Sequence, residues 1–337
     1  MMKNLVYLIL VVTVLIGVSC RKNTHKVKLS GNEKEVEIVK FGDEFFAAGY
    51  ADTSAIVALR NKYPDFFDLF TYRVIQIGGL GEELFFEGVK QFQTDTMILS
   101  IRKSVEQEFS DFSDIENSLR NAFKYYQFHF PSYELPVIYT YISGFNQSVV
   151  TADKIVGISL DKYLGREYEF YQHLNSTPSY KILNMHKGKI VSDVVYAWGV
   201  TEFDDSEKTN NLLDNMIYQG KIMYFVDALL PDEHDSIKIG YTKKQLEWCK
   251  MNEAKMWATL IENKMLYSTN RMDIVRYINP APSTSGFPIE SPGRTGVWIG
   301  WQIVRQYMKK HPETTLEQLM KNSDFQKILN DSKYFPD

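Results

Sequence analysis

Four polar side chains on two predicted helices are the residues of this sequence that could do chemistry. Ser192, Asp193 and Tyr196 lie on the first predicted helix, and Gln219 lies on the second. Residues four apart on a helix share one face, so Ser192 and Tyr196 point in the same direction. A serine hydroxyl beside a carboxylate could serve a hydrolase, with Ser192 as nucleophile or Asp193 as general base. That chemistry needs a partner base for the serine, and no histidine lies three or four residues from Ser192.

The spacing of these residues follows the H-E-x-x-H frame of zinc peptidases. In that frame two histidines hold Zn²⁺, the glutamate between them activates water, and a glutamate on a following helix, often in an E-G-x-A context, is the third ligand. Here residues 192–196 read S-D-V-V-Y, and Gln219 stands before Gly220. A hydroxyl, an amide and a phenol with a pKa near ~10 are poor zinc ligands at neutral pH. The sequence therefore predicts a degenerate site without metal, cofactor or catalysis.

The rest of the chain must position two amphipathic helices, predicted at 189–198 and 216–225. Successive helical stretches fill residues 43–128, and three segments rich in β-branched and aromatic residues then predict strands between 134 and 160. A small mixed sheet directly before the frame helix is also the element order of the zincins, in which an edge strand binds extended peptide. We therefore expect an α+β, predominantly helical fold of the zincin-like, gluzincin type.

Composition and charge exclude several classes of protein. With 337 residues, 44% hydrophobic and 14% aromatic, the chain can bury a large core. Its formal charge is −4, and removing residues 1–19, whose only charge is Lys3, leaves −5, so no basic surface for nucleic acid is expected. The two cysteines, Cys20 and Cys249, exclude a disulfide framework and a cysteine-rich zinc site. The acidic run at 232–235 is predicted to be a turn and not a metal site.

The N-terminus predicts export and lipidation. Lys3 is followed by an apolar run and by small residues before Cys20, which is typical of a lipoprotein signal peptide with Cys20 as the lipid-modified, palmitate-bearing first residue of the mature protein. The alternative is an uncleaved membrane anchor with an incidental cysteine; both place the bulk of the chain outside the cytoplasm. The predicted organisation is a signal peptide (1–19), a lipidated flexible tether (20–34) and a single peptidase-like domain (35–337) made of a helical part (35–130), the sheet and degenerate site (131–230) and a second helical part (231–337).

A C-terminal helix is predicted to pack unusually close to a neighbour. Ser291 can cap this helix and Pro292 can start it. Gly296 and Gly300, four residues apart, permit close approach by another element.

The same helix carries three candidate cleft contacts, Arg294, Trp298 and Trp301. Arg294 could meet a carboxylate in the cleft, or it could form a structural salt bridge; the sequence does not choose between these roles.

Several separated motifs together resemble the gliding motility lipoprotein GldB family of the Bacteroidetes over nearly the whole mature chain. These motifs are the lipobox, S-L-D at 159–161, I-G-Y-T at 239–242, Y-S-T-N at 267–270, Y-I-N-P-A-P at 277–282 and the segment 290–305. The resemblance implies an outer-membrane lipoprotein that faces the periplasm and is needed for gliding motility and for type IX secretion. It also implies partners among the proteins of those machineries. The family is similar to predicted zinc peptidases with H-E-x-x-H and E-G-x-A motifs.

We therefore expect a non-catalytic outer-membrane lipoprotein that contacts the membrane through Cys20 and binds protein along a peptidase-like cleft. Two alternatives remain open: a hydrolase of altered chemistry that uses the same cleft, and a purely structural scaffold.

Overall fold

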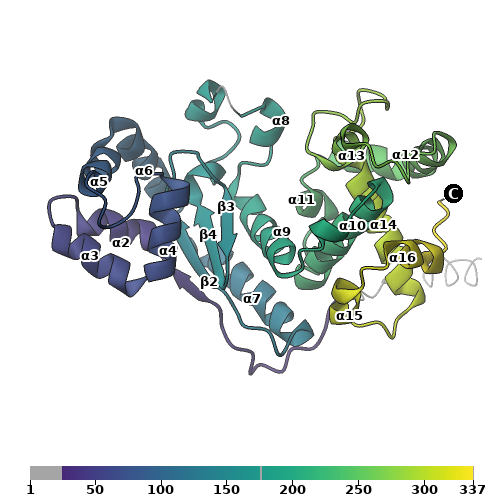
Figure 1. Ribbon diagram of the computed structural model, residues 1–337, viewed down its shortest axis with the longest axis horizontal. Helices are drawn as coiled ribbons and strands as arrows, with labels where there is room; N and C mark the ends of the chain where they lie inside the picture. The colour runs from purple at the N-terminus through teal and green to yellow at the C-terminus, as the bar shows by residue number, and fades with distance from the viewer. Residues whose placement is uncertain (1–24, 175–176, 337) are drawn as a thin grey trace, which may run out of the picture.

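The computed structural model describes residues 25–174 and 177–336. Figure 1 shows a small sheet in the middle of the molecule, with the N-terminal helices on one side and a larger group of C-terminal helices on the other. The predicted α+β, predominantly helical class is confirmed. The zincin-like assignment within that class stays a prediction.

The first helical group packs around an aromatic core. Phe41, Phe66 and Phe70 are buried in it together with Tyr139 and Tyr141 from the sheet. Because aromatic rings bury large apolar areas, this cluster fastens the helices to one face of the sheet. Its helices are α2 (Phe41–Ala48), α3 (Thr53–Lys62), α4 (Pro64–Leu69), the π-helical turn η1 (Phe70–Val74) and α5 (Phe85–Thr94). The buried residues of α6 (Thr96–Glu108) and α7 (Ser113–His129) belong to a second, larger core.

The described residues form a four-stranded mixed sheet in the order β1-β2-β4-β3. Strands β1 (Glu37–Val39), β2 (Val137–Tyr141) and β4 (Ile155–Ser159) are parallel, and β3 (Val149–Ala152) pairs antiparallel with β4. The predicted small mixed sheet before the frame helix is thus confirmed. Strand β3 occupies one edge and begins directly after a loop at 143–148.

The second helical group is built around α10 (Leu212–Leu229), which is buried along most of its length and packs against α9 (Ile190–Glu202) and α14 (Thr295–Lys310). A helix that is apolar nearly all round belongs in a core. The remaining elements are η2 (Leu160–Tyr163), η3 (Glu169–His173), α8 (Ser179–Ile182), η4 (Lys187–Lys189), η5 (Ser206–Lys208), α11 (Asp235–Ile239), α12 (Lys243–Glu262), α13 (Arg271–Ile278), α15 (Leu316–Lys321) and α16 (Phe325–Ser332).

Helices α10 and α14 cross at two glycines. A Cβ atom on Gly300 would lie 1.8 Å from the carbonyl oxygen of Met216, and a Cβ on Gly220 would lie 2.3 Å from the carbonyl oxygen of Gly300. No side chain fits at such separations, so the two backbones touch directly. The prediction that Gly300 permits close approach is confirmed.

Helix α14 begins later than the sequence indicates. Its first residue is Thr295, with Arg294 as N-cap in the left-handed region (φ 61°, ψ 28°). Ser291 does not cap it, because its hydroxyl accepts the backbone N–H of Thr284, whose own hydroxyl donates to the carbonyl of Pro292. The expected cap is used to fix the loop before the helix, which places Arg294 at the helix start.

Residues 25–34 run along the domain surface. Val27 and Leu29 pack against the core, Lys26 pairs with Asp232 at 2.6 Å, and the His25 ring packs edge-on to Tyr224. Cys20 lies outside the described residues. Within the described ranges, no helix has the length and apolar character that crossing a membrane requires.

Candidate functional site

The two frame helices bring two of the four predicted site residues, Tyr196 and Gln219, into contact. Ser192 and Tyr196 lie on α9, and the Tyr196 hydroxyl donates a hydrogen bond to the side-chain oxygen of Gln219 on α10. The third frame position, Gln219, therefore contacts the first frame helix. In this arrangement the phenol and the amide satisfy each other.

Lys189, one turn before the frame, contacts both of its first two residues. Its Nζ atom lies 2.8 Å from Oδ1 of Asp193 and 2.8 Å from Oγ of Ser192, and its side chain is 7% exposed. The other carboxylate oxygen of Asp193 accepts the hydroxyl of Tyr163 at 3.0 Å. Burial, then the charge of Asp193, raise the pKa of Tyr163 well above its ordinary value, so this phenol stays protonated as the donor. Asp193 is thus held by an ammonium group and a phenol.

Arg294 joins α14 to the frame. Its Nη1 atom donates to the carbonyl oxygen of Ile239 at 3.2 Å, and its Nη2 atom lies 3.4 Å from the hydroxyl of Tyr196. The guanidinium also lies 5.4 Å from the centre of the Tyr196 ring. Among the described residues no carboxylate pairs with Arg294, and the structure thus does not give it the salt-bridge role.

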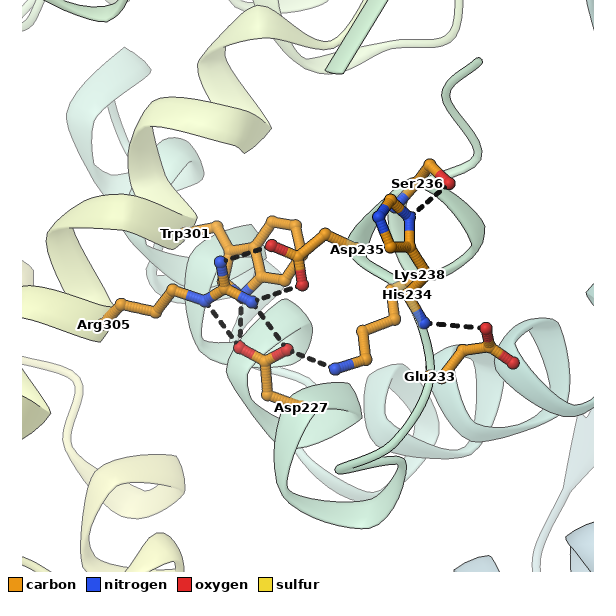
Figure 2. Close-up of polar contacts among 8 residues, drawn as sticks. All are labelled: Asp227, Glu233, His234, Asp235, Ser236, Lys238, Trp301 and Arg305. Atoms are coloured by element: carbon orange, nitrogen blue, oxygen red, sulfur yellow. Dashed lines mark hydrogen bonds and ion pairs between the residues drawn. The ribbon is translucent and has the colours of Figure 1, made fainter. Parts of the chain in front are cut away.

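A buried charge network holds the short helix α11 against α10 and α14. Figure 2 shows the side chains of Lys238 and Arg305 converging on the carboxylate of Asp227. The distances are 2.8 Å from Lys238 Nζ and 2.7 Å from Arg305 Nε, and Arg305 also makes two hydrogen bonds to Asp235, at 2.8 and 2.9 Å. The indole N–H of Trp301 donates to Asp227 at 2.8 Å. The acidic run at 232–235 therefore ends at the first residue of α11, Asp235, whose carboxylate pairs with Arg305.

Three successive carbonyl groups of α11 accept hydrogen bonds from Ser192 of the frame and from the two cations beside it, Lys189 and Arg294. The carbonyl of Ile237 lies 3.3 Å from the Ser192 hydroxyl, that of Lys238 accepts Lys189 at 3.3 Å, and that of Ile239 accepts Arg294. The charge network around Asp227 thus positions Lys189 and Arg294 indirectly, through the backbone of α11.

Asp161 fixes the loop at 143–148, which lies across a cleft from the start of α9 and from α11. Its carboxylate accepts the backbone N–H groups of Ser143 at 3.1 Å and Phe145 at 2.6 Å, and also the hydroxyl of Ser159. Phe145 has φ 68°, a conformation that costs a non-glycine residue energy and persists only where its surroundings hold it. Burial raises the pKa of Asp161, against the opposing effect of these hydrogen bonds. The hydrogen bonds of Asp161 therefore fix the backbone of the loop at 143–148.

Between these two sides lies a cleft of about 560 Å³. Its lining includes the loop residues 145–148, Lys189 and Asp193 at the start of α9, Ile239 and Gly240 of α11, and Arg294. Arg294 is part of this lining, and so is Asp193, whereas Ser192, Tyr196 and Gln219 are not. Trp298 and Trp301, expected as cleft contacts, do not line it: both indoles are at most 1% exposed and pack against each other in the core, where Trp301 donates to Asp227.

The frame does not suit a divalent cation. Ser192, Tyr196 and Gln219 present neutral oxygens that are already hydrogen-bonded, and the ammonium of Lys189 and the guanidinium of Arg294 lie against them. Zinc prefers imidazole, thiolate and carboxylate donors, and two fixed positive charges would repel it. In the described part of the chain, no three His, Cys, Asp or Glu side chains gather as a metal-binding group.

Sequence reasoning missed Lys189, Tyr163 and the Asp227 network. Lys189 could have been found, because it precedes Asp193 by four residues and such opposite charges attract on one helix face. Asp227 and Arg305 are 78 residues apart, and no local pattern relates them.

Comparison with known proteins gives one family. The family model described as gliding motility protein GldB matches residues 22–336. No curated protein and no solved structure matches this chain. Since the match spans the frame helices, the cleft and nearly all described residues, the chain belongs to the GldB family, a lipoprotein family involved in gliding motility.

Proposed function

We propose that this chain is a non-catalytic outer-membrane lipoprotein that faces the periplasm and supports gliding motility and type IX secretion by binding an extended polypeptide in its cleft. The observation that carries the proposal is the state of the frame. Lys189 contacts Ser192 and Asp193, and Arg294 contacts Tyr196. An open cleft of about 560 Å³ lies beside these residues. Such a site has binding surface, while both oxygens of Asp193, the carboxylate of the frame, are engaged by Lys189 and Tyr163 and are not free to activate water.

Ser192 and Lys189 are the observation that favours a second candidate, a hydrolase, because a serine next to a lysine can be a catalytic pair. The two atoms are 2.8 Å apart. The lysine would have to be neutral to accept the serine proton, yet its ammonium is paired with Asp193. Ser192 is also only 1% exposed, so a substrate cannot reach its hydroxyl. The binding function is therefore the better supported of the two.

An extended polypeptide fits the surroundings of the cleft. The loop 145–148 lines the cleft and leads directly into β3, which is an edge strand of the sheet. Edge strands present unpaired backbone groups, and extended peptides commonly bind by pairing with them. Side chains of such a peptide would enter the cleft next to the frame helices.

Filling the cleft is expected to abolish function without unfolding the protein. Gln147→Trp places a large side chain at an exposed position of the cleft lining, and Gln107→Trp makes the same change on the exposed face of α6. In a gliding bacterium that carries this chain as its GldB protein, we expect Gln147→Trp to stop colony spreading and Gln107→Trp to preserve it. Equal spreading by both variants would favour the purely structural scaffold.

The purified full-length protein in detergent separates binding from catalysis. We expect it to retain members of a displayed peptide library, to contain far less than one zinc per chain by elemental analysis, and to leave the peptides uncleaved. Cleavage that Ser192→Ala removes would instead support the hydrolase, and stoichiometric zinc would overturn the proposal.

The lipid anchor has its own test. Cys20→Ala is expected to lose incorporation of a labelled palmitate precursor and to release the protein from the membrane fraction, since a single thiol would carry the attachment. Cys249→Ala is the matched control, because this thiol is buried on α12. Continued acylation of Cys20→Ala would contradict the assignment of the anchor.

A further inference from the structure

The cleft is more basic than the protein that contains it. The whole chain has 42 acidic and 38 basic residues, a formal charge of −4. Among the described residues that line the cleft, the basic side chains are Lys162, Lys181, Lys189 and Arg294, and the acidic one is Asp193. A cleft with one sign of charge and low-dielectric walls focuses its field on a ligand of the opposite sign.

Three of these cations form no ion pair with another described residue. Lys189 is paired with Asp193, but the ion pairs of the described residues include none with Lys162, Lys181 or Arg294. Lys162 donates to the carbonyl oxygen of Phe145 at 3.2 Å, and Arg294 meets a carbonyl and a phenol. Burial, against the attraction of Asp161, lowers the pKa of Lys162, and the charge of Lys181 lowers it further. Two lysines thus lie close enough to repel each other at one end of the cleft.

Two long helices add to this field. Helix α9 starts after Lys189 and helix α14 starts after Arg294, both at the cleft lining. In the described structure no side chain caps either N-terminus. The positive end of each helix dipole therefore points toward the same space, which further favours an anion there.

We propose that the cleft recognises carboxylate groups of an acidic polypeptide segment, with Arg294, Lys162 and Lys181 as the groups that bind them. This inference rests on the proposed peptide-binding function and specifies its ligand. Arg294 presents the planar guanidinium that pairs with carboxylates in two parallel hydrogen bonds, and the carbonyl of Ile239 fixes its direction. The two lysines bind further along the lining, so one acidic segment reaches all three cations.

The test uses full-length protein in detergent and a displayed library of random peptides of about twelve residues. We expect the retained peptides to be enriched in Asp and Glu relative to the input library. Retention with no acidic enrichment overturns this inference and leaves the proposed function standing. If no peptides are retained, the proposed function fails as well.

A retained peptide, labelled and measured by fluorescence anisotropy, gives the quantitative arm. Converting its Asp and Glu residues to Asn and Gln should weaken binding at least about tenfold, because charge-assisted hydrogen bonds are lost. Amidation of its C-terminus tells whether the terminal carboxylate or the side chains supply the recognised group. Both are carboxylates, so either result fits the inference; equal affinity after both changes overturns it.

Charge variants of the protein complete the design. Lys181→Glu changes an exposed side chain and does not threaten folding, and Arg294→Gln removes the fixed guanidinium. Each should weaken the acidic peptide about tenfold while leaving its Asn/Gln counterpart unaffected. Lys250→Glu and Lys250→Gln on α12 make the same charge changes at an exposed position away from the cleft and should have no effect. If the cleft and control variants lose affinity for the acidic peptide equally, the effect comes from net charge, and the assignment of the cleft cations as the binding groups is overturned.

Discussion

Gly300→Ala is expected to destabilise the protein by about 3 kcal/mol or more, because the added methyl group would overlap the backbone of α10. Its Cβ atom would lie 1.8 Å from the carbonyl oxygen and 2.4 Å from the carbonyl carbon of Met216. A flexible side chain could move aside, but a helix backbone cannot, so α10 and α14 would have to separate. Alanine favours helix by about 1 kcal/mol over glycine, which offsets only part of this cost. Thermal and denaturant unfolding measure the loss.

The matched control is Gly188→Ala. It adds the same methyl group at an exposed position, where the nearest atoms, at 3.3 and 3.4 Å, belong to the side chain of His186. We expect a change of less than about 0.5 kcal/mol there. Gly220→Ala should resemble Gly300→Ala, since its Cβ would meet the backbone of Gly300 at 2.3 Å. Wild-type stability in Gly300→Ala would mean that the two helices are not in backbone contact.

Local patterns were enough to predict the strands and the two frame helices, but not where α14 begins. The strands after residue 134 follow from β-branched and aromatic runs, and the helices α9 and α10 from their apolar residues. The start of α14 could not be found in this way. Ser291 and Pro292 form a local start signal, but the hydroxyl of Ser291 binds Thr284 instead. A contact that depends on tertiary placement overrides the local preference.

The candidate site was predictable to the extent that spacing determines it. The pairing of Tyr196 with Gln219 follows from the frame, because residues at fixed intervals on two neighbouring helices meet. The charges beside the frame were not predictable in this way. Trp301 was expected to contact the cleft, yet its indole donates to Asp227 in the core. Whether a helical aspartate is exposed or buried depends on its partner, and Arg305 lies on another helix.

Asp227→Ala is expected to lower the free energy of unfolding by about 3–5 kcal/mol, because it leaves a buried positive charge without its partner. Arg305 keeps Asp235, but the described contacts of the Lys238 ammonium consist of its pair with Asp227, and that side chain is 4% exposed. Asp232→Ala is the control, since it removes an exposed pair with Lys26 and should cost less than about 1 kcal/mol. Similar losses in the two variants would contradict the buried role of Asp227.

The dependence of stability on pH identifies the charge of Asp227 as the cause. Burial raises the pKa of this carboxyl, but Arg305 and Lys238 outweigh burial and hold the pKa below its ordinary value. A carboxyl with a lowered folded-state pKa contributes stability above its unfolded-state pKa of about 3.9, and this contribution is lost as the pH falls through the lower value. Asp227→Asn should therefore be less stable than wild type near pH 7, and the difference should shrink below about pH 4. A difference in stability that is constant with pH would assign the loss to packing.

Because α11 also holds Lys189 and Arg294 through its carbonyls, Asp227→Asn should speed hydrogen exchange in 235–239 and weaken binding of the acidic peptide.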